Sequence, residues 1–291
     1  LQLSGIGDPS VLDPLGIDVR VNLPTVGRNF QDRTASNIVH STQPSFDAGG
    51  TGPEFTIAFL NIHELFSEGA GTNGSVTGDD IARYVLTQYP SWAQSQAVNG
   101  LNADALTTIF SIQADLIANH HGKRIVVNGI NTTLWNILPF SRGNITITDT
   151  SVFTKPKVTV NYFDVDYDLA VQTAGTRVGR KVLNHPAFAS ISSGETDPGM
   201  DVVPDDRNGG ADNAWHSWIH DEFASVFHEI GSAAMMRRDL GGVVDGKLRV
   251  YDTVNLRVVD ASILPLHISA HPSETLYGVA EKAADIIKSG V

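Results

Sequence analysis

The 291-residue sequence contains no cysteine, which excludes disulfide scaffolds, thiolate metal sites and cysteine nucleophiles. It also lacks any apolar run near the roughly 20 residues that a membrane-spanning helix requires. Basic residues are few, with 20 Lys and Arg against 32 Asp and Glu and a formal net charge of -12. Nucleic acids and anionic membranes are bound through clustered Lys and Arg, so neither is an expected partner.

Targeting information is sparse. The chain starts at Leu1 without an initiator Met, so we expect the true N-terminus to lie elsewhere. Three Asn-x-Ser/Thr sequons begin at Asn73, Asn131 and Asn144. They favour a secreted glycoprotein with an extracellular location, and an intracellular location stays open.

Apolar periodicity and turn residues predict a mixed chain. Helices are expected after Asp8 up to Gly16, from Asp79, and over residues 104–119, 166–183, 211–223 and 273–288. Strands are expected over residues 17–21, 36–41, 144–148, 157–162 and 256–260, the last one buried. Residues 192–212, rich in Gly, Asp, Pro and Ser, are expected to form a long loop.

The C-terminal region carries the residues with chemistry. His228 and His271 suit an alcohol proton, because a neutral imidazole is a natural base near neutral pH. Asp260 ends an expected strand, where it could accept hydrogen bonds from a ligand or simply cap a turn. Pro272 and Ser273 open the last helix, whose N-terminus favours an anion. A single such histidine is more often structural, so the argument depends on the set.

Several segments together resemble the glucose-methanol-choline (GMC) oxidoreductase family, nearest its fungal glucose oxidase and FAD-glucose dehydrogenase-like branch. They are LSGIG at 3–7, LPTVGRNFQD at 23–32 (followed by Arg33 where His is common), FSRG at 140–143, GETDPG at 194–199 and the GGVVD…LRVY…LRVVDAS…P…H run at 241–271.

The resemblance implies an α/β (overall α+β) flavoprotein of two domains. Residues 1–36 and 227–291 would belong to a Rossmann-like FAD-binding domain. Residues 37–226 would form a substrate domain built on a large antiparallel sheet flanked by helices. We identify no GxGxxG in the sequence, so we expect the phosphate-binding half elsewhere. The chain would be the C-terminal part of a longer enzyme, either a cleaved form that keeps its N-terminal partner or a fragment, and would expose a long apolar seam.

The resemblance also implies roles for single residues. His228 takes the position of the catalytic base and His271 that of its partner. FAD contacts would come from Asp260 and Ala261 (ribityl and phosphates), Pro272 and Ser273 (pyrimidine ring), and Asn29 and Asp32 (a cofactor-covering segment). No metal is implied.

Two departures bear on the substrate. The family usually reads His-Pro-Val-Gly-Thr or His-Gly-Val-Gly-Thr, whereas this chain has HEIGS at 228–232. Glucose-active members have an Asn two residues before the base, and here that position is Val226, followed by Phe227. Loss of a hydroxyl-binding side chain weakens discrimination for sugars, so a less polar alcohol is at least as good a substrate.

The expected activity is therefore FAD-dependent oxidation of a small alcohol, with hydride transfer to flavin N5 and O₂ or a quinone-type acceptor. Two alternatives stay open: a non-redox lyase or cyclase on the same fold, and a non-catalytic fragment.

Overall fold

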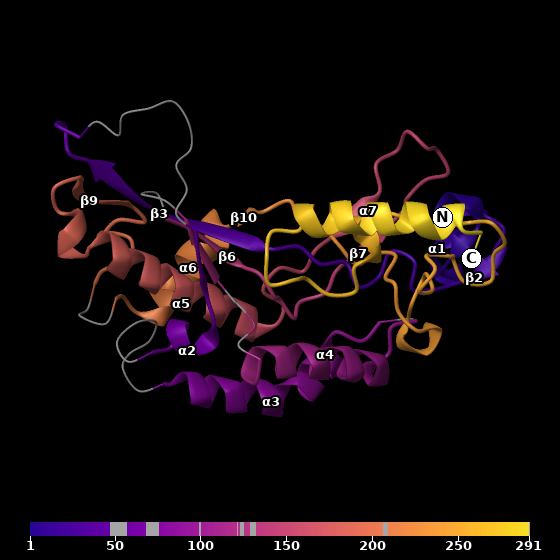
Figure 1. Cartoon of the computed structure of the whole chain (residues 1–291), viewed down its shortest axis with the longest axis horizontal. Coiled ribbons are helices and arrows are strands. Elements are labelled where there is room, and N and C mark those ends of the chain that lie inside the picture. The colour runs from indigo at the N-terminus through magenta and orange to yellow at the C-terminus, as the bar shows by residue number, and fades with distance from the viewer. Residues whose placement is uncertain are drawn as a thin grey trace.

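The structure is a computed structural model that describes residues 1–46, 57–67, 76–98, 100–120, 122, 125–128, 132–205 and 209–290. Figure 1 shows an elongated chain. At one end of the molecule lie β3, β9, α5 and α6, and at the other lie α1, β2, α7 and both termini. No described helix has the length and apolar character needed to cross a membrane.

One antiparallel sheet organises the larger end. Its strands run in the order β10-β3-β6-β5-β4, and β9 also pairs with β3. The bounds are β3 Thr34–Thr42, β4 Ile57–Leu60, β5 Ile125–Asn128, β6 Thr132–Asn136, β9 Ser192–Asp197 and β10 Ala224–Ser225. Strand β3 is central because its start pairs with β10 and β6 and its end pairs with β9.

Helices cover this sheet. α5 (Asp166–Leu183) packs against β3 and β6, and α6 (Asp212–Glu222) packs on α5. α2 (Ile62–Leu65), α3 (Gly78–Ser95) and α4 (Ala103–Ala118) form a second layer in which α3 and α4 pack together. α3 begins with a capping box between Thr77 and Asp80, which satisfies two N–H groups of its first turn. One apolar core joins these elements, including Ile38, Leu106 and Trp215.

The smaller end has its own core, formed by segments far apart in the sequence. It contains Ile6 and Leu23 together with Val243, Ile263 and Ala283. Its elements are the short helices η1 (Gln2–Ser4), η2 (Asp13–Leu15) and η5 (Ala261–Ile263), the helices α1 (Pro9–Leu12) and α7 (Ser273–Lys288), and the parallel pair β1 (Ile6–Gly7) and β2 (Val21–Asn22). The antiparallel pair β7 (Asn144–Thr146) and β8 (Lys157–Thr159) lies against it, since the Ile145 N–H donates to the Gly27 carbonyl. The remaining short helices are η3 (Pro186–Phe188) and η4 (Arg238–Leu240).

Most expected elements are confirmed. Asp8 caps α1 by accepting from the Ser10 N–H at 2.9 Å, and Gly16 ends the following η2 in the left-handed region. The helices expected from Asp79 and over 104–119, 166–183, 211–223 and 273–288 are present within a residue or two. Strands over 36–41, 144–148 and 157–162 are also present, the last two paired antiparallel as expected but shorter.

Three expectations are wrong. Residues 192–212 are not all loop, because β9 forms along the free edge of β3. The strand over 17–21 shrinks to β2, and residues 256–260 contain a single isolated bridge, from Arg257 to Arg249, and no named strand. The side chains of that last segment are also more open than expected, with Val259 37% exposed. In each case pairing with a neighbouring segment, which sequence periodicity does not report, decided the outcome.

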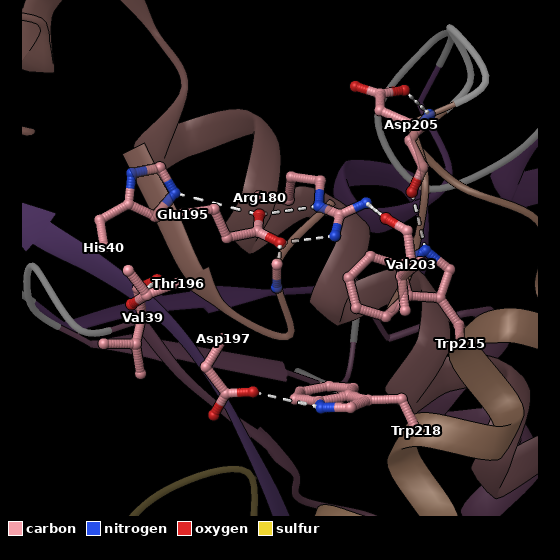
Figure 2. A network of polar contacts seen from close by, with 12 residues as sticks. Val39, His40, Arg180, Glu195, Thr196, Asp197, Val203, Asp205, Trp215 and Trp218 are labelled. Carbon is pink, nitrogen blue, oxygen red and sulfur yellow. Dashed lines mark hydrogen bonds and ion pairs between the residues drawn. The ribbon is translucent and has the colours of Figure 1, made fainter. Parts of the chain in front are cut away.

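A buried ion pair attaches β9 to α5 (Figure 2). The Arg180 guanidinium donates to both carboxylate oxygens of Glu195, at 2.8 and 2.5 Å, and to the Val203 carbonyl at 2.9 Å. Both charged side chains are at most 1% exposed. Arg180 also stacks over the Trp215 ring, and the His40 ring from β3 faces Glu195.

Gly27 holds the smaller end to β7, and we expect its replacement to be costly. It has a φ of +85°, and a Cβ there would lie 2.1 Å from the Ile145 carbonyl oxygen. Gly16 has a similar φ of +69° with nothing within 4 Å of its Cβ position. Gly16→Ala should therefore lower the free energy of unfolding by about 1 kcal/mol, and Gly27→Ala by at least about 2 kcal/mol more. Urea titrations of both variants measure the difference, and equal losses would show that the close approach to β7 relaxes freely.

Candidate active site

The two histidines meet at the surface of the protein. Nε2 of His228 lies 3.2 Å from Nε2 of His271, with the rings nearly perpendicular at 84°. Trp135 on β6 contacts both rings, with centroid separations of 5.6 and 6.1 Å. His271 is exposed and His228 is half-buried, so the facing nitrogens are open to a ligand.

Asp32 positions the segment that carries His228. Its Oδ1 accepts the backbone N–H of His228 at 3.0 Å and that of Arg33 at 2.7 Å. Its Oδ2 accepts the hydroxyls of Ser225 and Tyr162, each at 2.5 Å. Because hydrogen bonds to a carboxylate are strong, Asp32 pins the chain after β10 onto the start of β3.

Arg33 lies behind the pair with its side chain fully buried. Its Nη2 donates to the Ile268 carbonyl at 2.5 Å, and its Nη1 donates to the Ala270 carbonyl at 2.9 Å. Nη1 also lies 3.4 Å from Nδ1 of His228. One guanidinium therefore holds the backbone just before His271 and contacts the other imidazole.

These surroundings keep the imidazoles of His228 and His267 neutral. Burial, followed by the charges of Arg33 and His271, lowers the pKa of His228 to about 4, although Asp32 acts in the opposite sense. His267 is fully buried, and burial is the main reason that its pKa falls well below 6.5. Neutral imidazoles can donate or accept a proton at neutral pH, which is what alcohol chemistry needs.

The same shifts predict acid sensitivity. His228 and His267 resist protonation in the fold and titrate near 6.5 when the chain is unfolded, so their contribution to stability is complete above pH 6.5 and is lost progressively as the pH falls below that value. Between pH 7 and 5 the buried His267 should contribute to this loss, because its pKa in the fold lies well below 6.5. Urea titrations at pH 7, 6 and 5 measure the slope, and His267→Gln should flatten it. A slope unaffected by that substitution would exclude His267 as its source.

Asp260 acts as a helix cap in this chain. Its Oδ1 accepts the Ser262 N–H at 2.8 Å and the Ser262 hydroxyl at 2.5 Å, at the start of η5. Asp260 and Ser262 also line an open hollow of about 420 Å³, to which Gln2, Gly27 and Val258 contribute. Ala261, the first residue of η5, lies between them in sequence. The hollow borders the smaller core, and neither histidine lines it.

The start of α7 adjoins His271. Pro272 is the N-cap residue and Ser273 the first helical residue, and no described side chain caps this end. The Ser273 hydroxyl lies 3.2 Å from Nδ1 of His271. Uncapped N–H groups therefore stand beside the exposed imidazole, an arrangement that favours an electron-rich ligand.

Asn29 is buried, and both ends of its amide are engaged. Its Nδ2 donates to the Pro265 carbonyl at 3.0 Å, and its Oδ1 accepts from Nε of the buried Arg142 at 2.9 Å. Arg142 also donates to Gln113 on α4. Asn29, like Asp32, thus has its polar side chain turned into the protein.

Val226 and Phe227 directly precede His228 in the chain. The Val226 N–H donates to the Arg33 carbonyl at 3.0 Å, and its side chain is half-buried. Phe227 is 79% exposed and has a φ of +59°, which directs this aromatic ring to the surface beside His228.

Sequence reasoning missed three contributors. Arg33 was noted as a departure from the family pattern, and that departure was the available signal. Trp135 lies between two buried residues of β6, as any partly exposed strand residue does, so its sequence context carries no functional signal. Tyr162 gave no signal either, and burial together with its bond to Asp32 raises the pKa of its phenol.

The expectation that the sequence contains no GxGxxG is wrong. The bare GxGxxG spacing occurs once, at Gly69, Gly71 and Gly74, which lie outside the described residues. The described element before it is helix α2 and not a strand, so the setting differs from that of a dinucleotide fingerprint. Among the described residues no group of three His, Asp or Glu could hold a metal ion.

The fold is that of FAD-dependent oxidoreductases. An FAD-dependent oxidoreductase from Chaetomium thermophilum superposes with a TM-score of 0.85 at 23% identity, covering 100% of this chain and 53% of that one. A fungal aryl-alcohol oxidase superposes with a TM-score of 0.80 at 26% identity, covering 99% and 52%.

Residues 139–280 match the family model described as GMC oxidoreductase, and the chain carries the C-terminal domain of that family. It is 33% identical to a GMC oxidoreductase family protein (Mala s 12) of Malassezia sympodialis and 31% identical to a glucose oxidase of Aspergillus carbonarius. Each alignment covers 99% of this chain and 46% of the relative, so the chain spans about half their length. The expected family, the mixed fold and the antiparallel sheet are confirmed. None of these four proteins is named as a lyase or cyclase.

Proposed function

We propose that this chain is the C-terminal part of an FAD-dependent alcohol oxidoreductase, either an oxidase that uses O₂ or a dehydrogenase that uses a quinone-type acceptor. The observation that carries the proposal is the pair of facing Nε2 atoms of His228 and His271, 3.2 Å apart and open to a ligand. A hydroxyl placed between them would meet two imidazole nitrogens, one able to accept its proton and the other able to hold its oxygen.

The residues present fit an FAD. The uncapped N–H groups of the first turn of α7, which begins at Ser273 after the N-cap residue Pro272, suit the electron-rich pyrimidine end of a flavin. Asp260 and Ala261, beside the open hollow, suit the ribityl and phosphate portion. Asn29 and Asp32, whose side chains point inward, would hold the adjoining backbone in place. The bound flavin would supply the acceptor for the hydride of the alcohol carbon.

The activity requires an N-terminal partner that carries the phosphate-binding GxGxxG. Support comes from the length of the relatives and from the surface of α7, where Tyr277 is 77% and Ile287 50% exposed. An exposed amphipathic helix needs a covering surface.

Two separate apolar cores support assigning residues 1–36 and 227–291 to the FAD domain and 37–226 to the substrate domain.

We assign the substrate to the less polar alcohols. Val226 stands where sugar-active relatives have an Asn, and the exposed ring of Phe227 adds apolar surface beside the pair. The relative of similar fold named as an aryl-alcohol oxidase supports this choice. An apolar wall leaves sugar hydroxyls without partners, which penalises glucose.

Anaerobic flavin reduction tests the proposal. The full-length protein, loaded with FAD, is mixed with benzyl alcohol, a linear primary alcohol or glucose, and flavin absorbance is followed. We expect the first two to bleach the flavin faster than glucose does. If no alcohol bleaches it, the proposed function is wrong, and if glucose is fastest, the substrate assignment is wrong.

We also propose secretion as a glycoprotein, supported by the three sequons. Two of them, at Asn73 and Asn131, begin outside the described residues, and Asn144 begins β7. Yeast expression followed by endoglycosidase treatment should lower the mass of the secreted protein, and an unchanged mass would contradict the proposal.

A further inference from the structure

Arg33 connects the two histidines from behind. Its guanidinium contacts Nδ1 of His228 at 3.4 Å and donates to the Ala270 carbonyl, one residue before His271, at 2.9 Å. A third bond, to the Ile268 carbonyl at 2.5 Å, fixes the same segment. With the side chain completely buried, the guanidinium is held in one orientation relative to the His228 ring.

A guanidinium has N–H donors and no acceptor. Burial lowers the pKa of Arg33 to about 10, with the charge of Asp32 opposing the change, so Arg33 is protonated at neutral pH. Nδ1 of His228 must then offer a lone pair, because an Nδ1–H would point at another N–H. The ring proton of neutral His228 therefore sits on Nε2, the nitrogen that faces His271.

We propose that Arg33 is a positioning residue that fixes His228 as the Nε2–H tautomer, so that His228 donates to the substrate oxygen and His271 is the base. This inference rests on the proposed function. It reverses the roles that the family resemblance implies, in which His228 takes the proton.

The remaining contacts agree with one direction of donation. The Nε2–H of His228 points to Nε2 of His271, which must then be an acceptor. The ring proton of His271 is left on Nδ1, where the Ser273 hydroxyl oxygen lies at 3.2 Å and can accept it. Each nitrogen thus has a partner that suits it, from Arg33 to Ser273.

An alcohol between the two Nε2 atoms would take over these roles. Its O–H bond breaks, its proton bonds to Nε2 of His271, and the oxygen keeps the electron pair. The Nε2–H of His228 donates to that oxygen and stabilises the developing alkoxide.

Glutamine variants separate a donor from a base, because a Gln side chain can place an amide N–H near the Nε2 position but cannot take up a proton. In the FAD-loaded full-length protein, His228→Gln should lower the rate of flavin reduction by about tenfold or less. His271→Gln should lower it by about 10²- to 10⁴-fold. The opposite ranking would overturn the proposal.

Ring-nitrogen NMR tests the role of Arg33 without relying on turnover. In protein labelled with ¹⁵N-histidine, the His228 signals, identified by their loss in His228→Gln, should show a protonated Nε2 and an unprotonated Nδ1. Arg33→Met should mix the two tautomers, and Arg33→Lys, which keeps a donor, should restore most of the Nε2–H form. A protonated Nδ1 in the wild type, or an unchanged tautomer in Arg33→Met, would overturn the assignment. If no alcohol reduces the wild-type flavin, the proposed function fails while the tautomer result still stands.

Discussion

His271→Ala in the full-length protein is expected to lower kcat for its best alcohol by about 10²- to 10⁴-fold, the usual contribution of a positioned base. FAD content should stay near that of the wild type, because the His271 side chain is exposed and supports no core. The measurement is single-turnover flavin reduction at saturating alcohol, which isolates the chemical steps.

Added acetate sharpens this experiment. A carboxylate accepts a proton but has no N–H to donate at neutral pH. It should therefore partly rescue His271→Ala and fail to rescue His228→Ala, which lacks a donor. Rescue of His228→Ala alone would return the role of base to His228. His120→Ala serves as a control, because that imidazole follows α4, is 63% exposed and pairs with Asp115.

Arg180→Met is expected to lower the free energy of unfolding by about 3–5 kcal/mol, because it leaves the carboxylate of Glu195 buried without its cation. Replacing both residues by apolar ones should cost less than either single change, since no uncompensated charge then remains. Urea titrations of Arg180→Met, Glu195→Met and the double variant measure the three values.

An exposed ion pair provides the matched control. Arg237 and Asp239 are also bonded to each other, but their side chains are 75% and 61% exposed. Arg237→Met should change stability by no more than about 0.5 kcal/mol. Similar losses for Arg180→Met and Arg237→Met would show that burial of the pair in Figure 2 does not determine its contribution.

The sequence predicted elements with strong local signals. Helix α7 follows from its apolar spacing and α1 from the cap at Asp8, and both depend on residues within one or two turns. Strand β9 was missed because its Ser and Gly residues give no strand signal, and it forms only because the edge of β3 is available. Pairing of this kind depends on residues about 150 positions away.

The candidate site shows the same contrast between what local sequence predicts and what depends on distant residues. His228 and His271 were expected together because of a family pattern, and they lie 43 positions apart with their Nε2 atoms in contact. Arg33 could not be interpreted fully, because a charged residue in a sequence does not reveal that it will be buried against backbone carbonyls. Trp135 required knowledge of which face of β6 meets the histidines.

The smaller core also constrains synthesis on the ribosome. Ile6 and Leu23 are made more than 200 residues before their partners Val243, Ile263 and Ala283. At roughly 5–20 residues per second, the first segment waits on the order of 10 to 40 seconds with its apolar side chains uncovered. The sheet around β3 has all of its strands by Ser225, so it can form during this interval. Slow or paused translation between Ser225 and Ala283 should therefore lengthen the period in which a chaperone has to protect the N-terminal segment.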